Sequence, residues 1–208
     1  MGSRATGVFP QGGEVVIPHD AEAGPLSAVR NNVLQTSLAL LRDQGLYERY
    51  AELVPPDTLH HLLANVTPCW VPMDLVHSHY RACDAMQLSP QELEQLGQRA
   101  GENTRKVSIV VAQPEGESAF DVWANADRMH RVWKRLYQGG SVGIARLSPN
   151  EELVDFRGYT IHQHRYFRYG CVAAIRSAHE AVGVPVEVAK IVRYDQETHE
   201  LTVHLSWK

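Results

Sequence analysis

The chain has 208 residues, of which 44% are hydrophobic and 21% charged, and its formal net charge is -4. This composition is typical of a soluble globular protein with one large or two small domains. It argues against nucleic-acid binding through a basic surface, and no apolar run reaches the length of a membrane span.

Three cysteines, Cys69, Cys83 and Cys171, are widely spaced and form no Cys-x-x-Cys pair. Their odd number and spacing argue against a disulfide framework and against a zinc site made only of cysteines. The N-terminus also lacks the charged stretch and apolar core of a secretory signal. We therefore expect a cytoplasmic protein.

Residues 1–24 are rich in glycine, proline and polar residues, which predicts a flexible N-terminal arm. Within this arm, the apolar run Val15–Ile17 could form an edge strand. No linker divides the remaining chain, so residues 25–208 are predicted to be a single α+β domain. Its helical part spans 25–140, and its ββαββ part spans 141–208.

The spacing of apolar residues predicts a series of helices in the first part of this domain. Prolines and glycines mark where the helices begin and end. The predicted segments are a helix from Pro25 or Leu26 to Gly45, a helical stretch from Leu46 to Val54, a short helix capped by Asp57, and a helix that begins at Pro72.

The clearest local signal is Ser89-Pro90-Gln91-Glu92, which combines a capping box with proline at the first helical position. Further along, Val107–Ala112 is ambiguous, because its β-branched residues suit a strand as well as a buried helix. Another helix is predicted from Ser118 to Gly139-Gly140.

The last third of the chain is predicted to be a hairpin, a helix and a second hairpin. The resulting fold class is α+β, with an N-terminal helical layer packed on a small antiparallel sheet. The predicted segments are strands Ser141–Leu147 and Glu152–Tyr159, a helix Tyr166–Val182 closed by Gly183, and strands Pro185–Tyr194 and Glu200–Trp207.

Eleven histidines are a high count for this length and raise the question of a metal site. In an extended segment, His162 and His164 would project to the same side and could both bind one metal ion. A third ligand could come from Cys171 or His179. The alternative is that the histidines lie on the surface or half buried, without a metal.

A haem would need an axial ligand in an apolar pocket, for which His79, His130 and His164 are candidates. The chain has no Cys-x-x-Cys-His attachment sequence. On the helix from Pro72, His77 and His79 would point about 200° apart, so they would not share one ion.

Aromatic residues provide a second candidate site. Trp70, Tyr80, Trp133, His164 and Tyr166 are predicted to line a pocket between helices and sheet, where an apolar ligand could bind. The alternative is that these rings fill the core.

A catalytic pair is a weaker candidate. Cys83 and His79 have helical i, i+4 spacing, and a histidine can activate a neighbouring thiol. Cys83 also lies on an apolar stripe, where a free cysteine packs as a small hydrophobic residue, and we prefer that interpretation.

Several short motifs resemble a paralogous family of unknown function found in myxobacteria. That family is in turn similar to a superfamily of haem–nitric-oxide sensor domains, 4-vinyl-reductase-type ligand domains and vesicle-tethering subunits. The resemblance implies helices against a small antiparallel sheet, often with a ligand between them, and favours a helix for 104–112. The motifs are Leu41–Tyr50, Trp70-Val71-Pro72, Tyr80–Leu96 with Gly97, the aromatic helix ending at Gly139-Gly140, Tyr169-Gly170 and the strand ending at Trp207.

The sequence departs from these relatives at their ligand motifs. The Tyr-x-Ser-x-Arg sequence that binds haem propionates in the sensors is absent, and Tyr166-Phe167-Arg168-Tyr169 does not replace it. The segment Arg193–His204 has no cysteine, unlike the tail of the 4-vinyl-reductase type. The resemblance therefore carries no haem or metal ligand over to this chain.

The leading hypothesis is a non-enzymatic ligand-binding or signalling domain that holds a small apolar or aromatic molecule and acts on a protein partner. A haem- or metal-dependent sensor is one alternative. Another is a dimerising interaction module without ligand, with the strand ending at Trp207 as a free edge. The last alternative is an enzyme that uses Cys83 and His79.

Overall fold

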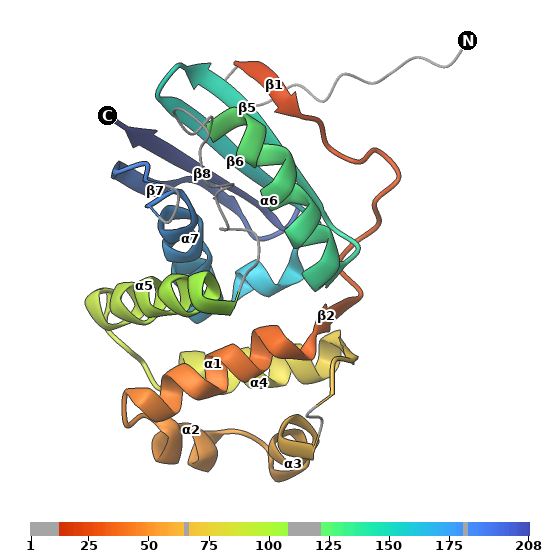
Figure 1. Cartoon of the computed structure of the whole chain (residues 1–208). Coiled ribbons are helices and arrows are strands. Elements are labelled where there is room, and N and C mark those ends of the chain that lie inside the picture. The colour runs from red at the N-terminus through yellow and green to blue at the C-terminus, as the bar shows by residue number, and fades with distance from the viewer. Residues whose placement is uncertain (1–12, 65–66, 108–121, 181–182) are drawn as a thin grey trace.

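The computed structural model describes residues 13–64, 67–107, 122–180 and 183–208 (Figure 1). The helices are α1 (Asn31–Asp43), α2 (Tyr47–Leu53), α3 (Pro56–Ala64), α4 (Met73–Ala85), α5 (Pro90–Val107), α6 (Val122–Leu136) and α7 (Arg165–Glu180), with a 3-10 helix η2 (Thr160–Gln163). The strands are β1 (Glu14–Ile17), β2 (Ala28–Arg30), β3 (Trp70–Pro72), β4 (Tyr137–Gln138), β5 (Ser141–Ser148), β6 (Glu151–Arg157), β7 (Val186–Asp195) and β8 (Glu200–Trp207).

Two regions make up the molecule. Helices α1 to α4 gather at one end, and the sheet with α6 and α7 forms the other, with α5 between them (Figure 1). The predicted fold class, an N-terminal helical layer on a small antiparallel sheet, is confirmed.

The larger sheet has five antiparallel strands in the order β1-β5-β6-β8-β7. Both predicted hairpins are present, and β6 joins them by pairing with β8, where Val154 lies opposite Val203. The expectation that the strand ending at Trp207 is a free edge is wrong. Strand β8 pairs with β6 on one side and with β7 on the other, so it lies inside the sheet, and β1 and β7 form the edges.

The first predicted helix begins later than expected. Ala28–Arg30 forms β2, which pairs with β3 and β4 in a small second sheet, and α1 begins at Asn31. The apolar spacing around Val29 suits a helix or a strand. Val29 forms a strand here because it pairs with Val71 of β3. The predicted turn at Trp70–Pro72 is also a strand, because it pairs with β2.

The capping box of α5 is confirmed. The backbone N–H of Ser89 donates to the carboxylate of Glu92 at 2.7 Å, and the N–H of Glu92 donates to the Ser89 hydroxyl at 3.3 Å. Further along α5, Gly97 allows a close approach to α7. A Cβ at this position would lie 2.4 Å from the Cβ of Ala173, so a larger residue would push the two helices apart.

One face of the larger sheet is covered by α6 and α7. Trp133 of α6 packs on Phe156 with ring centroids 5.2 Å apart, and His179 of α7 lies 3.0 Å from the carboxylate of Glu152. Phe156 and Glu152 are four residues apart on β6 and therefore point to the same face. The main hydrophobic core lies between this face, its helices and the helical layer.

The predicted edge strand at Val15–Ile17 is confirmed as part of β1, which pairs with β5. His19 then lies 2.9 Å from the buried carboxylate of Asp155 and 3.1 Å from the Ser141 hydroxyl. The predicted helical continuation after Val107, to Ala112, and the helix cap at Ser118 lie outside the described residues. Among the helices in the described ranges, none combines the length and hydropathy needed to cross a membrane.

Candidate ligand site between the helices and the sheet

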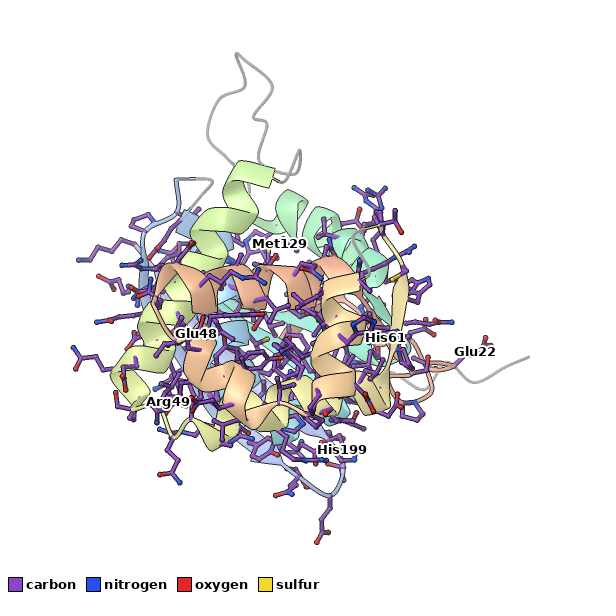
Figure 2. The ribbon with its side chains drawn as sticks, turned by 90° about the horizontal axis from the view of Figure 1, so that it is seen from below. Glu22, Glu48, Arg49, His61, Met129 and His199 are labelled. Carbon is purple, nitrogen blue, oxygen red and sulfur yellow. The ribbon has the colours of Figure 1, made fainter. Side chains whose placement is uncertain are left out.

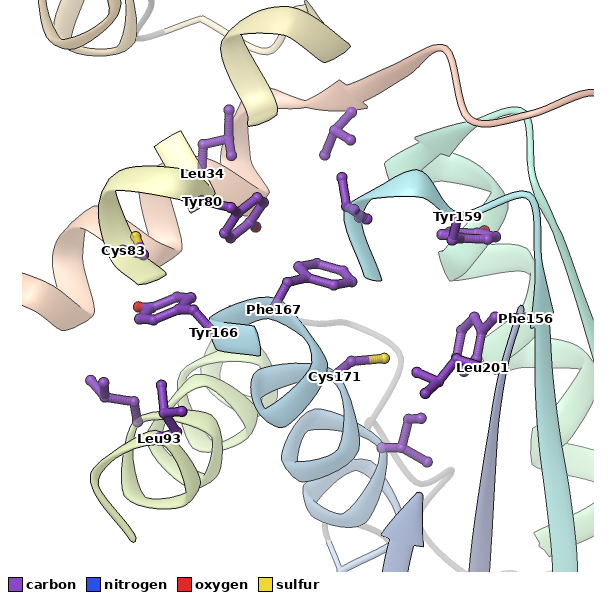
Figure 3. Packing of buried hydrophobic residues seen from close by; sticks show 14 of the residues in the cluster. Leu34, Tyr80, Cys83, Leu93, Phe156, Tyr159, Tyr166, Phe167, Cys171 and Leu201 are labelled. Carbon is purple, nitrogen blue, oxygen red and sulfur yellow. The ribbon is translucent and has the colours of Figure 1, made fainter. Parts of the chain in front are cut away.

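A cluster of aromatic rings connects the helical layer to the sheet (Figure 3). Tyr80 of α4 lies 5.1 Å from Phe167 of α7, and Phe167 in turn lies 6.4 Å from Tyr137 of β4. On the sheet side, Phe156 and Tyr159 meet edge to face at 5.5 Å. All of these side chains are buried, and this ring cluster is the place where the two regions meet.

His162 of η2 lies inside this ring cluster and is completely buried. Its imidazole packs on Phe156 at 5.0 Å and on Tyr159 and Phe167 at 5.5 Å. Neither ring nitrogen has a hydrogen-bond partner within the described part of the chain. Burial lowers the pKa of His162 to about 3, so the imidazole is neutral at physiological pH.

A chain of neutral hydrogen bonds crosses the helical layer. His79 of α4 lies 2.7 Å from the Tyr50 hydroxyl and 3.0 Å from the Ser37 hydroxyl, which donates to the Tyr166 hydroxyl at 3.2 Å. Burial, with the nearby charge of His164, lowers the pKa of His79 to about 3. This network joins α1, α2, α4 and α7 without a net charge.

Cys83 lies 3.7 Å from His79, as the i, i+4 spacing predicts. Burial raises the pKa of the Cys83 thiol well above its usual range. A protonated and buried thiol is a poor nucleophile, so this contact favours packing over catalysis.

A small cavity lies beside the ring cluster, between α6 and the start of β5. Its volume of about 20 Å³ is enough for about one water molecule. His130, Trp133 and Tyr137 line it together with Tyr159, which stacks on His162 and separates the cavity from that imidazole. The Nδ1 atom of His130 is buried and has no hydrogen-bond partner among the described residues.

The structure brings four of the five predicted ligand-binding residues to the ring cluster. Tyr80 lies 6.0 Å from His164 and 6.1 Å from Tyr166, and Trp133 joins the cluster through its stacking on Tyr137. Trp70 lies elsewhere. Trp70 is 38% exposed on β3, and the guanidinium of Arg30 lies over its ring at 4.1 Å.

The two histidines predicted to bind a metal lie in different surroundings. His162 is enclosed by rings, whereas His164 contacts His77 at 3.0 Å and Asp84 at 3.4 Å. Cys171 is buried in the core, and His179 pairs with Glu152. Within the described ranges, no three or more His, Cys, Asp or Glu side chains are grouped as a metal site.

Sequence reasoning missed the contact of His77 and Asp84 with His164. These two residues are seven positions apart on α4, and that spacing places them on one face of a helix. The spacing was therefore a usable signal, but only the fold shows that this face meets the segment after β6.

Solved structures of H-NOX domains share this fold. A point variant of the Tt H-NOX domain matches with a TM-score of 0.59 and 11% identity, over 86% of this chain and 95% of that domain. An oxygen-binding H-NOX domain related to soluble guanylate cyclases, in its oxygen complex, matches with a TM-score of 0.57 and 11% identity. This match covers 86% of this chain and 94% of that domain. A mutant of the T. tengcongensis H-NOX domain matches with a TM-score of 0.57 and 10% identity, over 86% of this chain and 97% of that domain.

At this low identity, the likeness establishes the fold: the chain has the architecture of H-NOX domains. The predicted resemblance to haem–nitric-oxide sensor domains is therefore confirmed for the fold. No family model matches the sequence, and no curated protein matches it. The narrower resemblance to a myxobacterial paralogous family stays a prediction.

Proposed function

We propose that this chain is a non-enzymatic sensor domain that binds a small aromatic molecule between the helical layer and the sheet. The observation that carries the proposal is His162, a buried imidazole whose two nitrogens have no partner among the described residues, inside a ring cluster. Buried polar groups in proteins are nearly always hydrogen-bonded, so an unpaired one needs an explanation. A ligand with an apolar ring and one hydrogen-bonding group would supply the missing partner.

The entry route follows from the position of Tyr159. This ring separates His162 from the small cavity lined by Trp133 and Tyr137, and it also lies against Gly140. Rotation of Tyr159 would join the cavity to His162 and open space for a ring. The ligand would then contact residues of α6, β6 and η2.

Occupancy of this site could reach the helical layer through a short path. His162 lies in η2, two residues before His164, which contacts Asp84 of α4. Asp84 also accepts the backbone N–H groups of Arg165 and Tyr166 at 3.0 and 2.7 Å, so it holds the first turn of α7. A displacement of η2 would change these contacts, and a protein partner or a second copy on the helical layer would detect the change.

A haem sensor is the second candidate, and the H-NOX fold favours it. A haem would require a much larger opening of the described residues than the aromatic ligand does. Ligand pockets for molecules of that size have volumes of roughly 300–1,000 Å³, whereas the cavity beside His130 holds about 20 Å³. His79 and His164, the other predicted axial ligands, are bonded to other side chains.

Native mass spectrometry of the purified full chain, together with its absorption spectrum, tests the proposed function first. A mass excess of a small molecule without a Soret band supports the sensor with an aromatic ligand. A Soret band would overturn it in favour of haem. An apo mass at twice the chain weight, with no binding in the titration below, would overturn it in favour of a dimerising module.

A titration with indole, which has one ring N–H, then tests the role of His162. We expect saturable binding that shifts the ¹⁵N resonances of the His162 ring and is lost in His162→Phe. His162→Phe should fold as stably as the native chain, because it removes an unpaired polar group and keeps a ring. Saturable binding that persists in His162→Phe would contradict the assignment.

A further inference from the structure

Two polar side chains meet one ring nitrogen of a third at the surface junction of α4 and η2. The Nδ1 atom of His77 lies 3.0 Å from the Nε2 atom of His164 and 3.0 Å from the amide nitrogen of Gln163. The two ends of a glutamine amide are interchangeable by rotation, so Gln163 can present its oxygen at this point instead. Two imidazole nitrogens and one amide oxygen can thus face the same small space.

The spacing of the two nitrogens suits ligands of a single ion. Two nitrogens at about 2.0 to 2.1 Å from a tetrahedral Zn²⁺ lie about 3.3 Å apart. Adjacent nitrogens around a square-planar Cu²⁺ or Ni²⁺ lie about 2.9 Å apart. The separation of 3.0 Å between His77 and His164 falls between these values. The ring centroids are 5.2 Å apart, so the two nitrogens now point at each other, and binding of an ion requires both imidazoles to turn until their nitrogens face one place beside this hydrogen bond.

The second ring nitrogen of each imidazole also has a polar partner, as is usual for metal-bound histidines. The Nε2 atom of His77 lies 3.1 Å from the Thr160 hydroxyl, and the Nδ1 atom of His164 lies 3.4 Å from the Asp84 carboxylate. Asp84 is itself fixed by two backbone N–H groups of α7. Each ring therefore presents its other nitrogen towards the shared space.

We propose that His77, His164 and Gln163 form a binding site for a divalent transition-metal ion of the Zn²⁺, Ni²⁺ and Cu²⁺ class. Imidazole is a preferred ligand of these ions, and water completes the coordination. Thr160 and Asp84 are positioning residues that orient the two rings. This site uses His164, but its partner is His77 and not His162.

The protonation states of the site are compatible with metal binding. In the tautomer in which Nδ1 of His164 donates to Asp84 and Nε2 of His77 accepts from Thr160, the Nδ1–H of His77 donates to Nε2 of His164. When an ion binds, solvent exchange moves this proton to Nε2 of His77, which then donates to Thr160. Burial and the charge of His164 lower the pKa of His77 to about 4; Arg81 and His199 lower it further and Asp74 opposes them, so the ring is neutral at physiological pH.

The ion also has a route to the site. Gln163 is exposed, His77 is half-buried and only His164 is buried. His199, on the hairpin between β7 and β8, lies at the edge of the molecule in Figure 2. Its charge acts on His77, so it belongs to the electrostatic surroundings of the site. The site is separate from the cavity beside His130 and does not depend on the proposed aromatic ligand.

Calorimetric titration of the untagged full chain with Zn²⁺ tests this proposal. A parallel spectrum of the Cu²⁺-loaded chain by electron paramagnetic resonance counts the coupled nitrogens. We expect one equivalent of Zn²⁺ and coupling to two imidazole nitrogens. His77→Ala should weaken Zn²⁺ binding by more than about 100-fold, and Thr160→Val should weaken it by about 10-fold, as loss of an outer partner does.

Two further variants make the result decisive. Gln163→Ala changes an exposed side chain, keeps the fold and should weaken Zn²⁺ binding several-fold. The double variant His60→Ala/His61→Ala removes two exposed histidines of α3 and should leave binding unchanged; His61 is labelled in Figure 2. Absence of saturable binding, or binding that is unchanged in both His77→Ala and Gln163→Ala, would overturn the proposal.

Discussion

The helical layer and the sheet bury polar groups in different ways. In the helical layer, Tyr50, His79, Ser37 and Tyr166 form a chain of neutral hydrogen bonds. In the sheet region, His179 pairs with the buried carboxylate of Glu152. Neutral networks are stabilising when every member is bonded, whereas a buried ion pair is stabilising only while both partners remain charged.

This difference predicts opposite responses to pH. Burial keeps His79 neutral, so protonation opposes folding of the helical layer. Burial also disfavours the charged form of His179, but the hydrogen bond and charge of Glu152 outweigh burial and raise its pKa. Protonation therefore favours folding at this site. The chain thus contains neutral imidazoles whose protonation weakens the fold in acid and one pair that is weakened by base.

The largest expected effect comes from breaking the ion pair of the sheet region. Glu152→Ala should lower the free energy of unfolding by about 3–5 kcal/mol, because it leaves His179 buried without its partner. Chemical denaturation at neutral pH measures this loss. The double variant Glu152→Leu/His179→Leu should recover most of it, since apolar residues of similar volume often replace a buried pair without loss. A single variant as stable as the native chain would show that the pair contributes nothing.

The neutral network should be less sensitive to the loss of one member. Tyr50→Phe should lower the free energy of unfolding by about 1–3 kcal/mol, because Nδ1 of His79 loses its partner. Tyr47→Phe is the matched control, since Tyr47 is nearby on the same helix and only half buried. If both variants lose the same stability, the hydroxyl of Tyr50 has no special role.

Lowering the pH should separate the buried neutral imidazoles from the His179–Glu152 pair. Between pH 6.5 and 5, each histidine that stays neutral in the folded chain and is protonated in the unfolded chain lowers stability by about 1.4 kcal/mol per pH unit. His79 and His162, whose pKa values are both about 3, act in this window. His162→Phe should reduce the slope of unfolding free energy against pH by about one proton.

The contribution of His179 has the opposite sign. Its pKa is raised in the folded chain, so its stabilisation is complete below the unfolded value near 6.5 and is lost as pH rises through the folded pKa. His179→Leu, in the Glu152→Leu background, should remove this loss at alkaline pH. If the free energy of unfolding still falls as the pH rises, another group titrates in that range.

The smallest effect is expected outside both regions, at the exposed capping box of α5. Ser89→Ala should cost about 1 kcal/mol, because the N–H of Glu92 loses its acceptor. Thermal unfolding measures this loss. Asp127→Ala, which breaks an exposed ion pair with Arg131, provides the reference and should change stability by less than about 0.5 kcal/mol.

Local signals predicted the parts of the fold that depend on neighbouring residues. The capping box at Ser89, the alternation in β8 and the stop at Gly183 each act within a few positions, and the observed elements follow them closely. Ala28–Arg30 was assigned wrongly because its partners, β3 and β4, are far away in the sequence. Apolar spacing alone cannot report such a pairing.

The candidate sites depended even more on distant contacts. Sequence reasoning selected Tyr80, His164 and Tyr166, which the fold brings to one ring cluster, but it also selected Trp70, which lies on the surface. It paired His164 with His162 because the two are near in sequence. A 3-10 helix does not place alternate residues on one side, and its geometry turned His162 into the core.

The sequence by itself determined the α+β class, the hairpin-helix-hairpin order and most helix ends, because caps, breakers and alternation are local. Tertiary structure alone decided that β8 lies inside the sheet, that His162 has no hydrogen-bond partner within the described residues, and that His77 meets His164. These outcomes follow from which surfaces pack together, and packing joins residues whose separation along the chain carries no signal.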